Sequence, residues 1–211
     1  MLQSVTRKFW SRITTLGIFL FIILYLVATF FYPGGSQEDK TIKGFSWLNN
    51  YWCDLLSEKA KNGYDNTARP IAIISWIVLC FSLSVFWYFL PMLFSINEKS
   101  KNVIRFFGLA ATAIAVFLFT SLHDIVIQSA GLLAFIAFIA VFAGLYKTRL
   151  YWFFYTGIFC FLLMGLNYGI MVGNTFISYL PLIQKITFII VLAWILLVNR
   201  EIYLSSSDDA R

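Results

Sequence analysis

The chain has 211 residues, of which 60% are hydrophobic and only 12% are charged, about half the charged share of an ordinary soluble domain. This composition excludes a typical soluble globular protein and indicates one integral membrane domain, residues 1–211. The net charge of +6 comes from short clusters beside apolar runs, a pattern that does not indicate a nucleic-acid-binding surface.

Six apolar runs are long enough to cross a hydrocarbon core of about 30 Å. We therefore predict an all-α fold, a bundle of six transmembrane helices. The expected spans are residues 13–32, 71–94, 103–123, 125–146, 150–172 and 182–199.

Three features set the expected ends of these spans. Pro91 should kink or end the second span, because an interior proline removes a backbone hydrogen bond. Residues 103–146 are too long for one crossing, so a tight hairpin should lie within residues 120–129. The polar tail, residues 200–211, is expected to fray.

Lysine and arginine residues predict the orientation, because cytoplasmic ends of spans carry an excess of them. Six spans place both termini on one side, which we expect to be the cytoplasmic side of the plasma (inner) membrane. The loop of residues 33–69 and the turn at residues 120–129 should then be extracytoplasmic. The residues that carry this prediction are Arg7, Lys8, Arg12, Lys99, Lys101, Arg105, Lys147, Arg149 and Arg200.

Small residues recur at helical spacing on the fourth and fifth spans and predict close helix packing. On the fifth span they are Gly165, Gly169 and Gly173, with Gly157 near the same face. The same face could instead mediate assembly with a second copy, or form a groove for a lipid. On the fourth span the small residues are Ala130, Ala134, Ala137 and Gly144.

Residues 46–60, in the long polar loop, have the pattern of an extracytoplasmic amphipathic helix. Aromatic and leucine side chains fall on one half of a helical wheel, and Asn50, Cys53, Asp54, Ser57 and Lys61 fall on the other. A helix lying in the membrane interface explains this pattern most simply. Alternatively, Asn50, Asp54 and Ser57 face the bundle and bind a headgroup, an ion or a substrate.

His123, the only histidine, is followed by Asp124. Helix capping accounts for both residues, since histidine favours a helix C-terminus and aspartate can cap the next helix. They are also candidates for acid–base chemistry with Asp54, or for a nucleophile pair with Cys53. One histidine is too few for an ordinary zinc site, so we expect no metal and no cofactor.

Arg69 precedes Pro70 at the expected outer end of the second span. Its guanidinium suits a lipid phosphate, Asp54 or Asp124, although simple snorkelling to the interface is the plainer interpretation. Lys185, in the first turn of the sixth span, has the same two interpretations.

The longest loop follows the first span and contains the motif WCDLL at residues 52–56 and then the turn NGYDN at residues 62–66. A histidine follows near the later hairpin. This arrangement resembles the DRAM-like six-span family and its bacterial relatives. That family carries a Ser-Asp-Leu-Gly type motif, where this chain has Cys53 and Leu56 at the serine and glycine positions. The resemblance implies a role connected with membrane lipids, with Asp54 and His123 as the matching positions.

We therefore expect a multi-pass membrane protein that binds a lipid headgroup or another amphiphile at its outer face. One alternative is a membrane-embedded lipid hydrolase or transferase using Asp54, His123 and Asp124. A further alternative is a small transporter, for which the spans offer few polar residues beyond Asn167.

Overall fold

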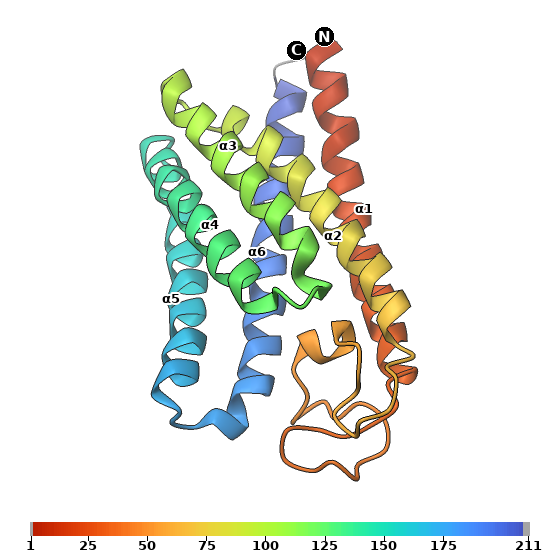
Figure 1. Ribbon diagram of the computed structural model, residues 1–211. Helices are drawn as coiled ribbons and strands as arrows, with labels where there is room; N and C mark the ends of the chain where they lie inside the picture. The colour runs from red at the N-terminus through yellow and green to blue at the C-terminus, as the bar shows by residue number, and fades with distance from the viewer. Residues whose placement is uncertain (1, 209–211) are drawn as a thin grey trace.

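The computed structural model describes residues 2–208 and is all-helical (Figure 1). Its long helices are α1 (Leu2–Phe30), α2 (Arg69–Phe89), α3 (Glu98–Ala115), α4 (His123–Lys147), α5 (Tyr151–Gly173) and α6 (Leu180–Asp208). Short 3-10 helices are η1 (Trp52–Leu56), η2 (Leu90–Leu93), η3 (Val116–Phe119) and η4 (Ile177–Tyr179). Within these described residues, six helical segments are long and apolar enough to cross a membrane, which confirms the predicted number.

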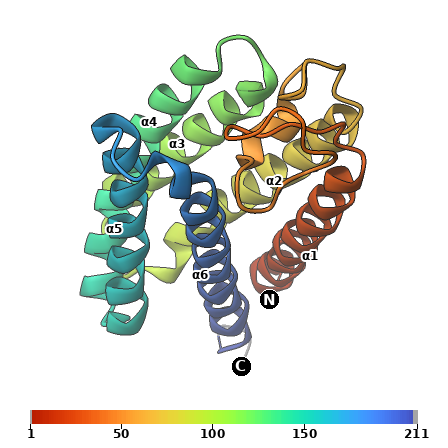
Figure 2. The same cartoon turned by 90° about the horizontal axis from the view of Figure 1, so that it is seen from below.

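The six helices form a ring in chain order. Each helix packs against the next one along the chain, and α6 returns to pack against α1 (Figure 2). The start of α1 and the end of α6 lie at one end of this ring, which we call the terminal end (Figure 1). The loop of residues 31–68 covers part of the opposite end, which we call the loop end.

Prolines and polar caps set several helix boundaries. As predicted, α2 stops just before Pro91, and the chain continues as η2. The side chain of Asn97 then accepts a hydrogen bond from Ser100 N at 2.8 Å, so α3 begins at Glu98, five residues earlier than expected. The expected hairpin is present, with α4 starting at His123.

The C-terminal tail does not fray at residue 200, because α6 continues to Asp208. Ile202 and Ser206 are buried in this extension. Arg7 Nε of α1 donates to Ser206 Oγ at 2.5 Å. Contacts with α1 therefore stabilise as helix a segment that was expected from its polar sequence to fray.

Buried polar side chains join α1 to both of its neighbours. Ser75 Oγ of α2 donates to Phe21 O at 2.8 Å, and Gly17 lies so close to Ser82 that a side chain there would collide with it. Toward α6, Asn199 Nδ2 donates to Ser11 O at 2.8 Å. Interhelical bonds of this kind each contribute about 0.6 to 2 kcal/mol between membrane helices.

The predicted small-residue packing is present at only part of α4 and α5. Ala137 is fully buried, Gly144 contacts the ring of Phe94, and Gly157 lies against Trp194. By contrast, a Cβ atom added at Gly165 or Gly169 would meet no other part of the described chain within 4 Å. The half of α5 nearer the loop end therefore presents its glycines to the surroundings.

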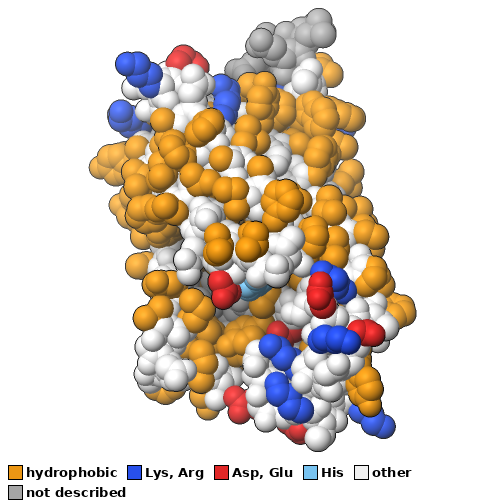
Figure 3. Space-filling model, viewed as in Figure 1, with side chains coloured by type: hydrophobic (Ala, Val, Ile, Leu, Met, Phe, Trp, Pro, Cys, Tyr) orange, Lys and Arg blue, Asp and Glu red, His pale blue; other side chains and the backbone are white. Residues whose placement is uncertain are grey.

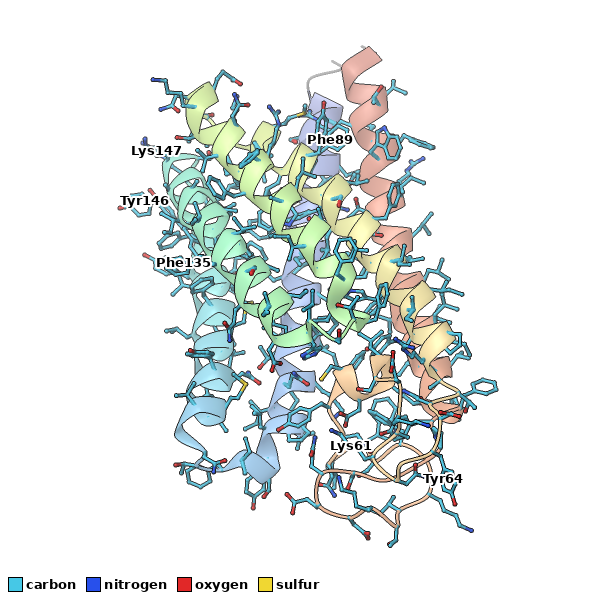
Figure 4. The ribbon with its side chains drawn as sticks, in the orientation of Figure 1. Lys61, Tyr64, Phe89, Phe135, Tyr146 and Lys147 are labelled. Carbon is cyan, nitrogen blue, oxygen red and sulfur yellow. The ribbon has the colours of Figure 1, made fainter. Side chains whose placement is uncertain are left out.

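On the face seen in Figure 3, hydrophobic side chains cover most of the middle, and most charged side chains lie toward the two ends. Of the most apolar stretch of α5, only 11% of residues are buried, so most of this surface faces outward. Figure 4 places Phe135 midway along α4, with Tyr146 and Lys147 at the terminal end of the same helix.

Candidate ligand-binding site at the loop end

The loop between α1 and α2 is an ordered structure held mainly by turns. Its only helix is the five-residue η1, so the predicted amphipathic helix over residues 46–60 is not formed. Gly35, at φ +78°, allows a sharp turn in which its N–H donates to Ile42 O at 2.7 Å. Thr67 Oγ1 donates to Phe31 O at 2.5 Å and joins the two ends of the loop.

Asp54 and Asn50 form the polar centre of this loop. Both are buried, with exposed fractions of 3% and 0%. Asp54 Oδ2 accepts from Tyr51 N at 2.9 Å and from Asn50 Nδ2 at 3.0 Å, while Oδ1 lies 3.3 Å from Lys61 Nζ. These two side chains, placed by sequence on the polar half of a helix, instead fold the backbone around themselves.

Asn50 extends this centre to the start of the loop. Its Oδ1 accepts from Ser46 N at 2.8 Å, and its Nδ2 also donates to Gly35 O at 2.9 Å. Lys61, the ion-pair partner of Asp54, lies on the part of the loop toward α6, whereas Tyr64 lies at its outer edge (Figure 4). The side chains of Asn50 and Asp54 are thus directed into the folded loop rather than toward water.

Lys185 of α6 joins the loop to the helical bundle. It is buried, and its Nζ donates to Asn50 O in the loop and, at 2.9 Å, to Pro181 O at the start of α6. The ammonium group also lies 5.7 Å from the centre of the Phe45 ring. Sequence interpretation favoured snorkelling for this lysine, although its place one turn after Pro181 was a usable signal that it faces the loop.

Trp52 fixes η1 over the end of the bundle. Its ring stacks on Tyr25 of α1 at 4.9 Å between ring centres, and Tyr25 Oη donates to Trp52 O at 2.9 Å. Phe188 of α6 lies 5.5 Å from the same ring. Aromatic contacts of this kind contribute about 0.5–1.5 kcal/mol each beyond the area they bury.

A partly open cavity of about 230 Å³, with polar and apolar side chains in its lining, lies where the loop meets the connection from α5 to α6. Asn49 and Tyr51, which flank the buried Asn50, form part of one wall. Pro181, whose carbonyl accepts from Lys185, belongs to the opposite wall. The full lining is Gln37, Glu38, Asn49, Tyr51, Ile177, Ser178 and Pro181.

The buried groups bond to lining residues of this cavity or to their neighbours. Asp54 accepts from Tyr51 N, and Lys185 donates to Pro181 O in the lining and to the carbonyl of Asn50, which lies between Asn49 and Tyr51 in the sequence. Asn50 and Asp54, expected to contact a ligand themselves, therefore hold the residues that line the cavity. Burial raises the pKa of the Tyr51 hydroxyl, and the negative charges of Asp54 and Glu38 add to this effect.

Cys53 is a thiol rather than a thiolate at neutral pH. Burial raises its pKa to about 12, and the neighbouring Asp54 carboxylate acts in the same direction. A nucleophilic cysteine needs the opposite environment, one that lowers its pKa. Cys53 therefore does not have the properties of the nucleophile considered from sequence.

Arg69 bonds to protein groups on two sides. Its Nε donates to Leu56 O at 3.1 Å, and its Nη2 donates to Phe119 O at 3.1 Å and lies 3.3 Å from Glu58 Oε1. It thereby connects the loop to η3 and, rather than to Asp54 or Asp124, pairs with Glu58. Ser57, next to η1, is exposed and outside the cavity lining.

His123 and Asp124 form a separate pair. His123 Nδ1 lies 3.1 Å from Asp124 Oδ1 in the first turn of α4, so the histidine does not end the preceding helix. The Asp124 side chain is 91% exposed. In the described part of the chain, no recorded hydrogen bond or ion pair connects this pair to Asp54 or Cys53.

Within residues 2–208, no three His, Cys, Asp or Glu side chains come together as metal ligands would. No protein-family model, curated protein or solved structure matches the chain. The geometry of the loop end is therefore the basis for a functional proposal.

Proposed function

We propose that this protein spans a membrane six times and binds the polar head of a lipid or similar amphiphile in the cavity at its loop end. The observation that carries the proposal is a cavity with polar groups in its lining, next to which Lys185 connects the loop, through Asn50 O, to Pro181 O at the start of α6. A lipid-directed role is also what the resemblance to the DRAM-like family implies.

The size and lining of the cavity support a headgroup as the ligand. Its volume of about 230 Å³ is below the roughly 300–1,000 Å³ typical of pockets that enclose a whole drug-sized molecule. Amide, hydroxyl and carboxylate groups line it beside Ile177 and Pro181, and these polar groups suit a head with hydroxyl or amine groups. Glu38 supplies the only acidic side chain of this lining.

The surroundings support an apolar tail on the same ligand. Phe176 and Tyr179, which flank the cavity residues Ile177 and Ser178, are 70% and 63% exposed. Aromatic side chains are enriched where a membrane meets water. An amphiphile with its head in the cavity would place its tail beside these rings.

Native mass spectrometry of the full chain, extracted in mild detergent, tests this proposal. The added ligands are phosphatidylethanolamine, phosphatidylglycerol and phosphatidylcholine with identical acyl chains. Ser178→Phe should fill the cavity and weaken retention of the preferred lipid at least tenfold. Ser57→Phe makes the same change on an exposed serine outside the cavity and should leave retention unaltered.

A second variant tests the link between the walls. Lys185→Met keeps a long apolar side chain but removes both hydrogen bonds to the walls, so hydrogen exchange of residues 46–54 should accelerate and lipid retention should fall. Lys59→Met, at a lysine with a 64% exposed side chain on the same loop, serves as control. No lipid retained by the unaltered protein, or equal retention by Ser178→Phe and Ser57→Phe, would reject the proposed site.

The contact between His123 and Asp124 favours one second candidate, a lipid hydrolase or transferase in which His123 acts as the base and Asp124 orients it. Turnover of a labelled lipid mixture by the purified protein tests this. His123→Ala should abolish turnover, whereas turnover that persists in this variant would remove His123 from the mechanism.

A further inference from the structure

An open groove with a volume of about 460 Å³ lies at the terminal end, between α1 and α6. Figures 1 and 2 both show the N-terminal end of α1 beside the C-terminal end of α6 here. The lining consists of Ser11, Arg12, Thr15, Leu16, Leu196, Arg200 and Tyr203.

This groove combines two cations with apolar walls. Arg12 on α1 and Arg200 on α6 are both exposed, while Leu16 and Leu196 lie about one turn further toward the middle of the molecule. Each guanidinium has N–H donors beyond those that its protein contacts use. Arg12 Nη2 donates to Tyr203 Oη at 2.8 Å, and Arg200 Nη1 lies 3.9 Å from Glu201 Oε1, a long contact for an ion pair.

The position of the arginines matches one surface of a bilayer. Arg12 precedes Phe30 by 18 residues, or about 27 Å of helix, and Arg200 follows Pro181 by 19 residues, or about 28 Å. Both lengths are close to the roughly 30 Å of a hydrocarbon core. When the loop ends of α1 and α6 lie at one membrane surface, the two guanidinium groups therefore lie near the phosphates of the other.

The floor of the groove is fixed. Asn199 Nδ2 donates to Ser11 O at 2.8 Å and to Thr15 Oγ1 at 2.9 Å, and Ser11 Oγ donates to Asn199 O at 3.0 Å. These bonds hold α1 and α6 together beneath the two arginines. The groove is therefore formed before any ligand arrives, which reduces the ordering cost of binding.

We propose that this groove binds an anionic phospholipid, with its phosphate between Arg12 and Arg200 and one acyl chain along Leu16 and Leu196. Guanidinium groups recognise phosphate oxygens through paired N–H donors, and the apolar wall receives the chain. This site is independent of the cavity at the loop end and lies at the opposite end of the molecule.

Titration of delipidated full chain, in detergent, with phosphatidylglycerol and phosphatidylcholine of identical chains tests the proposal by native mass spectrometry. Phosphatidylglycerol should bind more tightly to the unaltered protein. Because each arginine near a membrane surface contributes about fivefold to binding of anionic lipid, Arg200→Gln should weaken this affinity about fivefold, and Arg12→Gln with Arg200→Gln about 25-fold. Phosphatidylcholine affinity should fall less, because its choline ammonium offsets the charge of its phosphate.

Three controls separate the groove from general charge. Lys99→Gln with Lys101→Gln removes two cations from the start of α3 and should leave the preference unchanged. Leu196→Trp keeps both arginines but fills the groove, so it should weaken binding of both lipids. Thermal unfolding of each variant shows whether the helices still pack, and Arg200→Gln should unfold as the unaltered protein does.

Equal affinity for the two lipids in the unaltered protein would overturn the proposal. It would also be overturned if the lysine variant lost as much preference as the arginine variant, or if glycerol phosphate displaced phosphatidylglycerol at equal concentration. Ser178→Phe, at the loop end, should not affect this preference, so this test and that of the proposed function can fail separately.

Discussion

At the scale of single residues, the loop end shows how burial can change the chemistry of a side chain that the sequence presents as reactive. Cys53 and Asp54 are adjacent in the only long polar loop, which made both candidates for catalysis. In the folded loop the carboxylate is occupied by Tyr51 N, Asn50 and Lys61, and the thiol has a pKa raised to about 12. Both properties depend on tertiary contacts, which no local pattern contains.

The raised pKa predicts that Cys53 reacts slowly with alkylating reagents. At pH 8 a thiol with a pKa near 8.5 is about one-quarter ionised, so Cys53 should react on the order of 1,000-fold more slowly than free cysteine. Because the folded pKa is above the unfolded one, its rate should keep rising about tenfold per pH unit up to about pH 12. Iodoacetamide labelling of a Cys80→Ser, Cys160→Ser background measures this rate.

Unfolding supplies the control for this measurement. In denaturant the same cysteine should react as free cysteine does, with its rate levelling off above about pH 9. A fast reaction at pH 8 in the folded protein would show that burial does not suppress the thiolate.

Asp54 should be a determinant of loop stability. Asp54→Ala removes an acceptor that serves the buried Asn50 Nδ2 and the partly buried Tyr51 N, so we expect a loss of about 2 kcal/mol in the free energy that holds the loop closed. Asp54→Asn retains an oxygen for Tyr51 N and Asn50 Nδ2 and should cost clearly less. The rate of proteolysis within residues 57–65 measures loop opening.

Asp65→Ala is the matched control for Asp54→Ala. Asp65 pairs with Lys59 on the surface, where its side chain is 87% exposed, so its loss should leave the proteolysis rate almost unchanged. Equal proteolysis of the two alanine variants would mean that the buried carboxylate does not hold the loop.

At the scale of elements, the sequence predicted the long helices well and the loop poorly. Apolar runs, together with proline, specify where a helix can cross a membrane, and these signals located all six helices. The 46–60 stretch has a helical pattern of apolar residues, but Asn50 and Asp54 bond to backbone groups of Ser46 and Tyr51. Those bonds compete with helix formation, and a helical wheel does not show them because it gives only the direction of each side chain around the axis.

The exposed half of α5 leads to a prediction about assembly. We propose that Gly165 and Gly169, which no part of the described chain covers, pack against a second copy of the molecule. Gly165→Leu and Gly169→Leu should then reduce cross-linked dimer in membranes. Gly131→Leu on α4 adds the same side chain at another glycine with open space and should leave the dimer yield intact.

The test of this assembly is whether the α5 glycine variants lower the dimer yield more than Gly131→Leu does. A single monomeric species in all variants and in the unaltered protein would exclude self-association through α5. A reduction by Gly131→Leu equal to that by Gly169→Leu would show that added bulk anywhere on the surface is responsible.

At the scale of the whole molecule, the unequal distribution of positive charge predicts orientation. The described terminal end carries nine lysine and arginine residues, Arg7 to Arg12, Lys99 to Arg105, Lys147 to Arg149 and Arg200. The loop end carries six, and the same number of acidic residues accompanies them. We therefore expect the terminal end to be cytoplasmic and the loop end to lie outside.

Single cysteines in a cysteine-free background test this orientation directly. Tyr64→Cys replaces a residue of the loop that is 72% exposed, so a membrane-impermeant maleimide should label it in intact cells. Lys99→Cys, at the start of α3, should be labelled only after the membrane is permeabilised. These positions are better probes than Cys53, because burial suppresses its thiolate at the pH of labelling. Labelling of Lys99→Cys but not of Tyr64→Cys in intact cells would reverse the orientation, and would place the Arg12 and Arg200 groove in the outer leaflet.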